Sequence, residues 1–89
     1  MPPEFDWDLG NEEHIARHNV EPYEVEEAMT DPERLGIDVH DQGKKGIIGQ
    51  TEDGRILFVV YAIRHGKYRV ITARDLTDRE KHAFRRRNR

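Results

Sequence analysis

Residues 54–75, with the sequence GRILFVVYAIRHGKYRVITARD, contain two apolar runs joined by His65, Gly66 and Lys67. In the first run, residues 56–62, the side chains of both faces are apolar, which is typical of a central strand covered on both sides. The second run alternates two sets of side chains, one drier and one wetter, namely Tyr68, Val70, Thr72 and Arg74 against Arg69, Ile71, Ala73 and Asp75. Because Gly66 allows a tight reversal of the backbone, the stretch predicts an antiparallel hairpin.

The length and composition of the chain limit what it can be. With 89 residues, we expect one domain, residues 1–89, that buries roughly 60 to 65% of the surface exposed by the unfolded chain. The lack of cysteine excludes disulfides and thiolate zinc sites, and it fits a reducing cytoplasm. No apolar run reaches the roughly 20 residues of a membrane span, and the acidic N-terminus is unlike a signal peptide. We therefore expect a soluble cytoplasmic protein that does not bind membranes.

The charged residues are distributed unevenly. Residues 1–33 hold eleven Asp and Glu against one basic residue, Arg17, whereas residues 34–89 hold fourteen Lys and Arg against seven acids. The net charge of −3 hides this asymmetry. The basic part can attract a polyanion, while the acidic part would repel it. The same charges also allow a balance between two faces of one molecule, since surface charge seldom needs a partner.

The N-terminal part predicts a short strand followed by a helix. Phe5 and Trp7 alternate with acidic residues, as in an edge strand that turns its aromatic side chains toward a core. Asp8 is suited to cap a helix over residues 9–18, with Ile15 as the main apolar anchor.

A second helix follows at once. Asn19 lies where a helix end needs a left-handed residue, and Val20 would fold back onto the first helix. Pro22 suits the first turn of the second helix, and four apolar residues recur there at helical spacing, namely Tyr23, Val25, Ala28 and Met29. The Asp-Pro pair at 31–32 ends the helix.

The rest of the chain predicts a sheet and a last helix. Four segments have the alternation of strands: residues 34–40, 46–51, 55–62 and 68–74. The Asp-Gly pair at 53–54 is a strong hairpin signal. Thr77 and Glu80 match a capping box, so a helix begins there, with Ala83 and Phe84 directed inward. The sequence thus predicts an α+β fold with two N-terminal helices, a four-stranded antiparallel sheet plus the short N-terminal strand, and a C-terminal helix.

In their order and spacing, these segments resemble the BrnT-type toxins of bacterial type II toxin–antitoxin modules, small relatives of the RelE-like ribonucleases. The matching residues extend over nearly the whole chain, namely Phe5-Asp6-Trp7-Asp8, Asn11, Arg17-His18-Asn19-Val20, residues 24–28 and 49–55, Val59-Val60-Tyr61, Arg64, residues 69–74, and Thr77 with Glu80. The resemblance implies a RelE-like sheet flanked by helices. It also implies a toxin that cleaves RNA and that a BrnA-like antitoxin with a DNA-binding segment holds inactive.

Cleavage of RNA without a metal needs a base for the 2′-hydroxyl, cations that stabilise the phosphorane, and an acid for the leaving 5′-oxygen. Arginine suits the second task, because its planar donors engage phosphate oxygens in pairs. The end of one antiparallel strand lies beside the start of its neighbour, so we expect Arg55 and Arg74 to form a phosphate clamp. Arg64 lies toward the opposite end, and the resemblance keeps it as a catalytic candidate. Each of these arginines can instead form a structural salt bridge or lie solvated on the surface.

Two histidines, His18 and His82, are candidates for proton transfer, since histidine titrates near neutral pH. His18 can instead complement the negative end of its helix. His14 and His18 stand four residues apart, a spacing that can bind a metal, but no third ligand is obvious. A metal-dependent hydrolase is therefore a minor hypothesis, and we expect neither a metal site nor a cofactor.

Five further residues are candidates for contact with RNA: Tyr61, Tyr68, Lys67, Arg69 and Arg85. The tyrosines can stack on a base, although aromatics in strands are also good packing residues. Arg85 begins a basic run, residues 85–89, which can grip a phosphate backbone or be a solvated tail. The first hypothesis is thus an endoribonuclease toxin with RNA as substrate and an antitoxin as partner. The alternative is a catalytically inactive binding module that only pairs with an antitoxin or self-associates as a homodimer.

Overall fold

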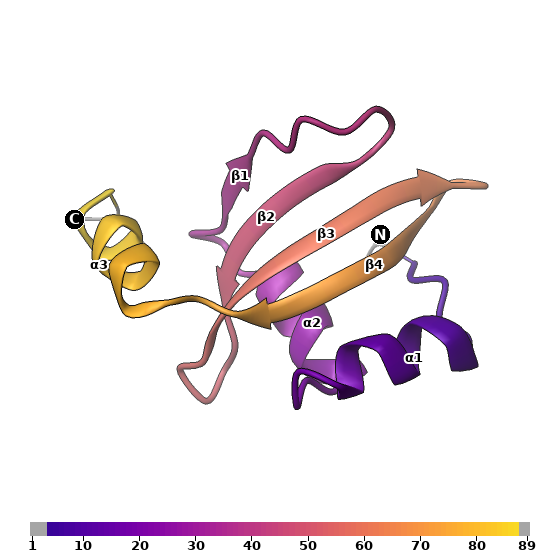
Figure 1. Ribbon diagram of the computed structural model, residues 1–89, viewed down its shortest axis with the longest axis horizontal. Helices are drawn as coiled ribbons and strands as arrows, with labels where there is room; N and C mark the ends of the chain where they lie inside the picture. Colours follow the sequence, from indigo (N-terminus) through magenta and orange to yellow (C-terminus); the bar gives the residue numbers. More distant parts are fainter. Residues whose placement is uncertain (1–3, 88–89) are drawn as a thin grey trace.

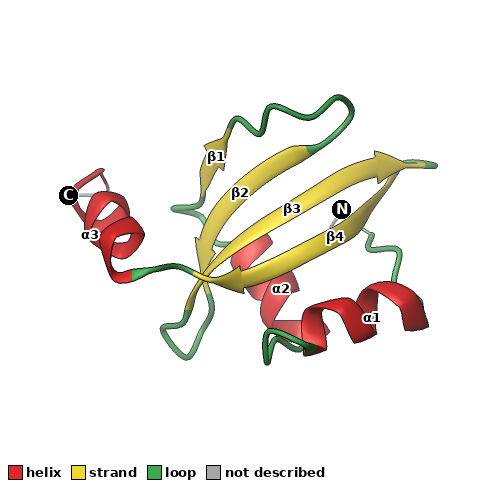
Figure 2. Ribbon diagram, viewed as in Figure 1, coloured by secondary structure: helices red, strands yellow, loops and turns green. Residues whose placement is uncertain are grey.

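The computed structural model describes residues 4–87 of the chain, with the side chain of Arg87 excepted. This part of the chain forms helices on a four-stranded sheet (Figures 1 and 2). In chain order the elements are α1 (Leu9–Ala16), α2 (Pro22–Met29), β1 (Leu35–Ile37), β2 (Lys45–Gln50), β3 (Ile56–Arg64), β4 (Lys67–Asp75) and α3 (Asp78–Arg87). The predicted α+β fold is confirmed. Residues 88 and 89 of the basic run lie outside the described residues.

The strands follow one another along the chain and pair as antiparallel neighbours in the order β1-β2-β3-β4. His65 and Gly66 join β3 to β4 with φ angles of 54° and 75°. Two successive left-handed residues make a hairpin turn whose twist matches that of the flanking strands. β3 pairs on both sides, so the predicted hairpin and the central position of the strand are confirmed. The predicted cover on both faces is only partial, because Phe58, Val60 and Ala62 on one face are half-buried.

The strand boundaries differ from the predicted ones for reasons that lie in the pairing. β1 covers only Leu35–Ile37 of the predicted 34–40, because Ile37 pairs with Gly46 and the chain leaves the sheet beyond that pair. β3 extends past residue 62, because the two-residue turn lets the ladder continue to the Arg64–Lys67 pair. β2 ends at Gln50, since the N–H of the next residue, Thr51, donates to the carbonyl of Arg55 and closes the turn between β2 and β3.

The predicted N-terminal strand is reduced to a single parallel bridge between Phe5 and Tyr68. The N–H of Asp6 donates to the Tyr68 carbonyl at 2.9 Å, and the N–H of Tyr68 donates to the Glu4 carbonyl at 2.9 Å. The chain then turns into α1, so the ladder does not continue. Phe5 and Trp7 pack against the main core, as expected.

A β-bulge interrupts β4. Val60 pairs with Thr72, but the next residue of β3, Tyr61, pairs with Val70, so Ile71 has no direct partner. A shift of one residue moves the following side chains to the other face of a sheet. The simple alternation predicted for this strand is therefore wrong from the bulge onward.

The bulge changes which residues of β4 lie on each face of the sheet. Val70 and Ala73 are both buried in the cluster formed with α1 and α2, although they are three positions apart and would lie on opposite faces of a regular strand. Tyr68 packs against the same cluster, whereas Arg74 pairs with Phe58 on the other side of the sheet. We call these two sides the α1–α2 face and the α3 face.

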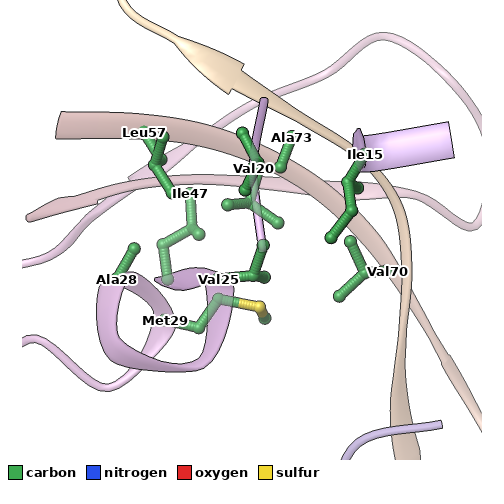
Figure 3. Packing of buried hydrophobic residues seen from close by; sticks show 10 residues of the cluster. Ile15, Val20, Val25, Ala28, Met29, Ile47, Leu57, Val70 and Ala73 are labelled. Atoms are coloured by element: carbon green, nitrogen blue, oxygen red, sulfur yellow. The ribbon is translucent and has the colours of Figure 1, made fainter. Parts of the chain in front are cut away.

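The main core lies between the sheet and the two N-terminal helices (Figure 3). It contains buried side chains from α1, α2, the segment between them and three strands: Ile15, Val20, Val25, Ala28, Met29, Ile47, Leu57, Val59, Val70 and Ala73. β2 and α2 approach so closely that a Cβ atom at Gly49 would lie 1.9 Å from the carbonyl oxygen of Ala28. Only glycine permits this contact.

α1 begins as predicted and ends earlier than predicted. Asp8 and Asn11 form a capping box, and the Asn11 side chain also donates to the carbonyl of Val70 at 3.2 Å, beside the bulge. The helix stops at Ala16 rather than at residue 18, because residues 17–19 turn the chain. Asn19 has the predicted left-handed φ of 59°, and Val20 folds back to donate its N–H to Ile15 at 3.2 Å.

α2 starts with Pro22, as predicted, and buries Val25, Ala28 and Met29. Tyr23 does not join them and is 55% exposed. A step of two residues turns a side chain about 200° around a helix, so Tyr23 lies far from the stripe that begins at Val25.

The α3 face holds a smaller cluster. Phe84 of α3 packs with Ile48, Ile56 and Leu76, and the predicted capping box of Thr77 and Glu80 starts the helix. Ala83 is exposed, contrary to the prediction, because one helical step turns it about 100° away from Phe84. Figure 1 shows α3 beyond the end of the sheet where β4 stops. No helix in the described residues is long and apolar enough to cross a membrane.

Candidate functional site

Arg55 lies directly before β3 and uses all its hydrogen-bond donors within the protein. Its Nε and one Nη donate to the two carboxylate oxygens of Asp75, at 2.7 and 2.9 Å. The other three N–H groups reach the Glu24 carboxylate at 3.0 Å and the backbone carbonyls of Asn19 and His18 at 2.6 and 3.2 Å. A guanidinium has five N–H donors, so none is left for a phosphate. Arg55 therefore ties β3 and β4 to the start of α2 and to the segment that precedes it.

The electrostatics of this residue agree with a structural role. The hydrogen bonds that Arg55 donates to Asp75 raise the pKa of Arg55, and the one to Glu24 adds to the effect. In return, the Arg55 guanidinium lowers the pKa of Asp75. Asp75 therefore keeps its charge beside Arg55.

The predicted clamp of Arg55 and Arg74 is wrong. Arg55 lies on the α1–α2 face with Glu24 and Asp75, whereas Arg74 lies on the α3 face against Phe58. Without the bulge in β4, the two arginines would share one face. The one-residue shift therefore separates them.

Arg74 keeps part of its donor capacity free. Its guanidinium carbon lies 5.1 Å above the ring centre of Phe58. Nη1 donates to Glu80 at 2.9 Å and to the carbonyl of Asp75 at 3.0 Å, and Nη2 donates to Glu80 at 3.1 Å. The Nε–H and one Nη2–H have no partner among residues 4–87. The side chain is 39% exposed, so part of it is open to solvent.

Glu80 links Arg74 to the start of α3. One of its carboxylate oxygens also accepts the N–H of Thr77 at 2.9 Å. The hydrogen bond from Arg74, followed by that from Thr77, lowers the pKa of Glu80 from 4.5 to about 2. A carboxyl group with this pKa is a weak base, so Glu80 is suited to hold Arg74 rather than to carry protons.

The two histidines proposed for proton transfer do not meet near Arg74. The His18 side chain is exposed on the segment after α1, and only its backbone carbonyl contacts Arg55. His82 is exposed on α3, two residues beyond Glu80, and a helical step of two residues directs it about 200° away. His14 and His18 have ring centres 6.2 Å apart, and no group of three or more potential metal ligands occurs within the described part of the chain.

The other basic candidates have different surroundings. Lys67 faces Glu4 at 3.7 Å, and Arg69 binds Asp6 at 3.4 Å and Asp8 at 3.0 Å. These two cations thus hold the N-terminal segment beside β4. The Arg64 and Arg85 side chains are exposed and make no ion pair within residues 4–87, so both remain available to a ligand.

Tyr61 and Tyr68 come together in a cavity of ≈ 600 Å³ on the α1–α2 face, near the β3–β4 turn. Their ring centres lie 5.3 Å apart, with an edge-to-face angle of 76°. The remaining walls come from the end of α2, from β2, from the hairpin and from the N-terminal segment, namely Met29, Thr30, Arg34, Ile47, Ile63, Gly66 and Glu4. Burial raises the pKa of Tyr61, and the nearby Arg34 acts in the opposite direction.

Arg34 is a residue that the sequence analysis did not single out. It donates to the carbonyl of Asp31 at 3.1 Å and makes no ion pair within the described residues. Its position in the sequence, directly after the turn that ends α2, gave no sign of a site. Only the pairing of β1 with β2, which brings residue 35 opposite Ile48, places it beside the cavity.

A comparison with protein families adds an independent finding. Residues 7–80 match the model of the family described as "Ribonuclease toxin, BrnT, of type II toxin-antitoxin system". No curated protein matches the chain. The matched range contains α1, α2, the whole sheet and the start of α3, and it ends at Glu80, the partner of Arg74.

Proposed function

The chain belongs to the BrnT family of ribonuclease toxins from type II toxin–antitoxin systems, and from this premise we propose that it cleaves RNA on the α3 face, with Arg74 at the scissile phosphate. The observation that carries this proposal is the state of the two arginines. Arg55 has no free donor, whereas Arg74 has two, on a partly exposed side chain beside a helix rich in cations.

The proposed reaction is attack of a ribose 2′-oxygen on the adjacent phosphorus. The bond from phosphorus to the 5′-oxygen breaks, which leaves a 2′,3′-cyclic phosphate and a 5′-hydroxyl, while one proton leaves the 2′-hydroxyl and another joins the 5′-oxygen. Negative charge accumulates on the phosphorane oxygens, and a guanidinium held in place stabilises it. We assign this charge-stabilising role to Arg74 and assign no proton carrier, because His18 and His82 both lie away from it.

The surroundings of Arg74 suit a polyanion. Arg79, Arg85 and Arg86 on α3 are exposed and make no ion pair within residues 4–87. They add positive charge to the helix that also carries Glu80, the partner of Arg74, and this charge would attract an RNA backbone. We propose Arg85 as one of these backbone contacts.

We further propose that an antitoxin neutralises the protein by covering the α3 face. Val60 and Ala62 on this face are only half-buried, and Phe58 and Leu35 are also partly open to solvent. A protein laid across this surface would block access to Arg74.

The alternative, a toxin-like module without catalysis, draws support from the ion pair that engages Arg74. One experiment separates the two proposals. Purified protein is incubated with single-stranded RNA, and the initial cleavage rates of the wild type, Arg74→Ala and Glu80→Gln are compared. Removal of one donor that stabilises transition-state charge lowers rates by roughly 10²- to 10³-fold, so we expect a loss of this size in Arg74→Ala.

Glu80→Gln is the matched control, because it breaks the same ion pair and keeps both Arg74 and a side chain suited to the capping box. If Arg74 acts on RNA, Glu80→Gln retains activity. Equal losses in both variants would mean that the ion pair is only structural, and no cleavage by the wild type would favour the binding module. Arg17→Ala, which changes an exposed arginine at the end of α1, should cleave like the wild type.

A further inference from the structure

We propose that the cavity lined by Tyr61, Tyr68 and Arg34 is a second RNA contact, which holds one nucleotide with its base against the tyrosine rings and its phosphate on Arg34. The cavity lies on the α1–α2 face, whereas Arg74 lies on the α3 face. The inference relies on the proposed function for RNA as the ligand. It adds a binding subsite that is separate from the cleavage surface.

The cavity has the size and walls of a site for a planar ligand. Its volume of ≈ 600 Å³ falls within the range of about 300 to 1,000 Å³ that is typical of pockets for small ligands. Met29 and Ile47 supply apolar walls, and Ile63, 56% exposed, lies at the rim. An exposed isoleucine beside two aromatic rings is an apolar surface that a base can cover.

Neighbouring aromatic side chains hold Tyr68 in position, and Tyr61 packs against Tyr68. The ring of Phe5 lies 5.6 Å from that of Tyr68, edge to face, and stacks on Trp7 at 6.3 Å. Trp7 in turn donates to the Glu26 carboxylate at 2.8 Å. The hydroxyl groups of Tyr61 and Tyr68 make no hydrogen bond with the described residues, so both remain free for a ligand. Stacking of one base on an aromatic side chain contributes about 1 to 3 kcal/mol.

The charges around the rings favour an anionic ligand. Arg34 donates only to a backbone carbonyl, and Lys45, the cross-strand neighbour of Tyr61, is exposed without an ion pair within residues 4–87. The one carboxylate in the lining, that of Glu4, faces Lys67 at 3.7 Å. Aromatic rings flanked by unpaired cations are suited to a base with its phosphate, the combination found where proteins bind single-stranded RNA.

The test is a titration of the full-length protein with adenosine 5′-monophosphate, followed by amide NMR spectra. We expect shifts at Thr30, Ile63, Gly66 and Tyr68, with a Kd on the order of 1 mM for a single nucleotide. Adenosine lacks the phosphate and ribose 5-phosphate lacks the base, so each should bind at least about 10-fold more weakly.

Two substitutions separate the roles. Arg34→Ala should weaken the nucleotide to the affinity of adenosine and leave adenosine unchanged. Tyr61→Leu should weaken both, whereas Tyr61→Phe keeps the stacking ring and should weaken neither by more than a few-fold. Arg17→Ala is the charge-matched control and should bind as the wild type does.

Several outcomes would overturn the inference: no shifts at these amides with the nucleotide at about ten times the expected Kd, shifts confined to α3 and the strand ends beside Arg74, or equal binding by the wild type and Arg34→Ala. Shifts at the cavity with a purified antitoxin but not with the nucleotide would identify a protein-binding pocket instead. Cleavage that depends on Arg74 without nucleotide binding at the cavity would leave the proposed function intact. Nucleotide binding at the cavity without cleavage of RNA would support the nucleotide site and contradict the proposed function.

Discussion

Replacement of Arg55 by alanine tests whether this residue is structural, because it removes all five of its hydrogen bonds at once. We expect Arg55→Ala to lower the free energy of unfolding and to alter RNA cleavage only through that loss. The side chain is 23% exposed, and it joins two strands to α2 and to the segment before it. The substitution therefore leaves a gap in the contact between the sheet and the helices.

The size of the effect follows from the two carboxylates that lose their partner, those of Glu24 and Asp75. Glu24 has a side chain only 12% exposed, so it would keep a buried charge without its cation, a change that costs about 3 to 5 kcal/mol at full burial. Asp75 is 51% exposed, and water would replace its ion pair at a cost of about 0.5 kcal/mol. Because both carboxylates are partly exposed, the sum of these two costs is reduced, and we expect Arg55→Ala to lower the free energy of unfolding by about 3 kcal/mol. Arg55→Lys keeps the charge but not the planar fork, so it should lose about half of this.

The assay is urea unfolding followed by circular dichroism. A small domain loses about 1 kcal/mol of stability per molar urea, so the midpoint of Arg55→Ala should fall by about 3 M, with an unchanged slope. Arg64→Ala is the control, because Arg64 lies at the other end of β3, is exposed and makes no ion pair with the described residues. Its free energy of unfolding should stay within about 0.5 kcal/mol of the wild type.

Two results would refute the reasoning about Arg55. Equal midpoints for Arg55→Ala and Arg64→Ala would show that the five contacts contribute no stability. A stable Arg55→Ala variant that has lost RNA cleavage would return Arg55 to the catalytic site. A double-mutant cycle with Glu24→Gln gives a further check, since residues in direct contact should couple by at least about 0.5 kcal/mol.

Two more predictions follow from single contacts. Gly49→Ala should lower the free energy of unfolding by about 1 to 3 kcal/mol or prevent folding, because the new Cβ would meet the Ala28 carbonyl, whereas Gly36→Ala, with nothing within 4 Å, is its control in the same urea assay. The contacts with Arg74 and, second, with Thr77 lower the pKa of Glu80 from 4.5 to about 2, so the contribution of Glu80 to stability is complete above about pH 4.5 and is lost as the pH falls toward 2. Between about pH 4.5 and pH 2, the urea midpoint of Glu80→Gln should therefore change less with pH than that of the wild type. An equal change with pH in both proteins would contradict the low pKa of Glu80.

Local features of the fold could be predicted because their causes are local. The left-handed Asn19, the turn at His65 and Gly66, and the capping box at Thr77 each depend on residues within one turn of chain. The central position of β3 follows from its apolar residues alone. The family resemblance drawn from the sequence is likewise confirmed by the match over residues 7–80.

The arrangement of the candidate site could not be predicted in the same way. Nothing in the sequence from Val70 to Ala73 distinguishes a bulged strand from a regular one, since Ile71 suits either face. Yet the bulge decides that Arg74 leaves the face of Arg55. Arg34 depends on long-range pairing as well, because it reaches the cavity only through the register of β1 on β2.

The ion pair of Arg74 and Glu80 sets a condition on catalysis at the α3 face. With a pKa of about 2, Glu80 is ionised at neutral pH and does not release Arg74 by taking up a proton. A phosphate must therefore bind through the two free donors of Arg74 or displace Glu80 from it. Displacement would also remove the carboxylate that accepts the N–H of Thr77, so it would loosen the start of α3. If displacement is required, Glu80→Gln should bind and cleave RNA better than the wild type, whereas binding through the free donors predicts unchanged activity.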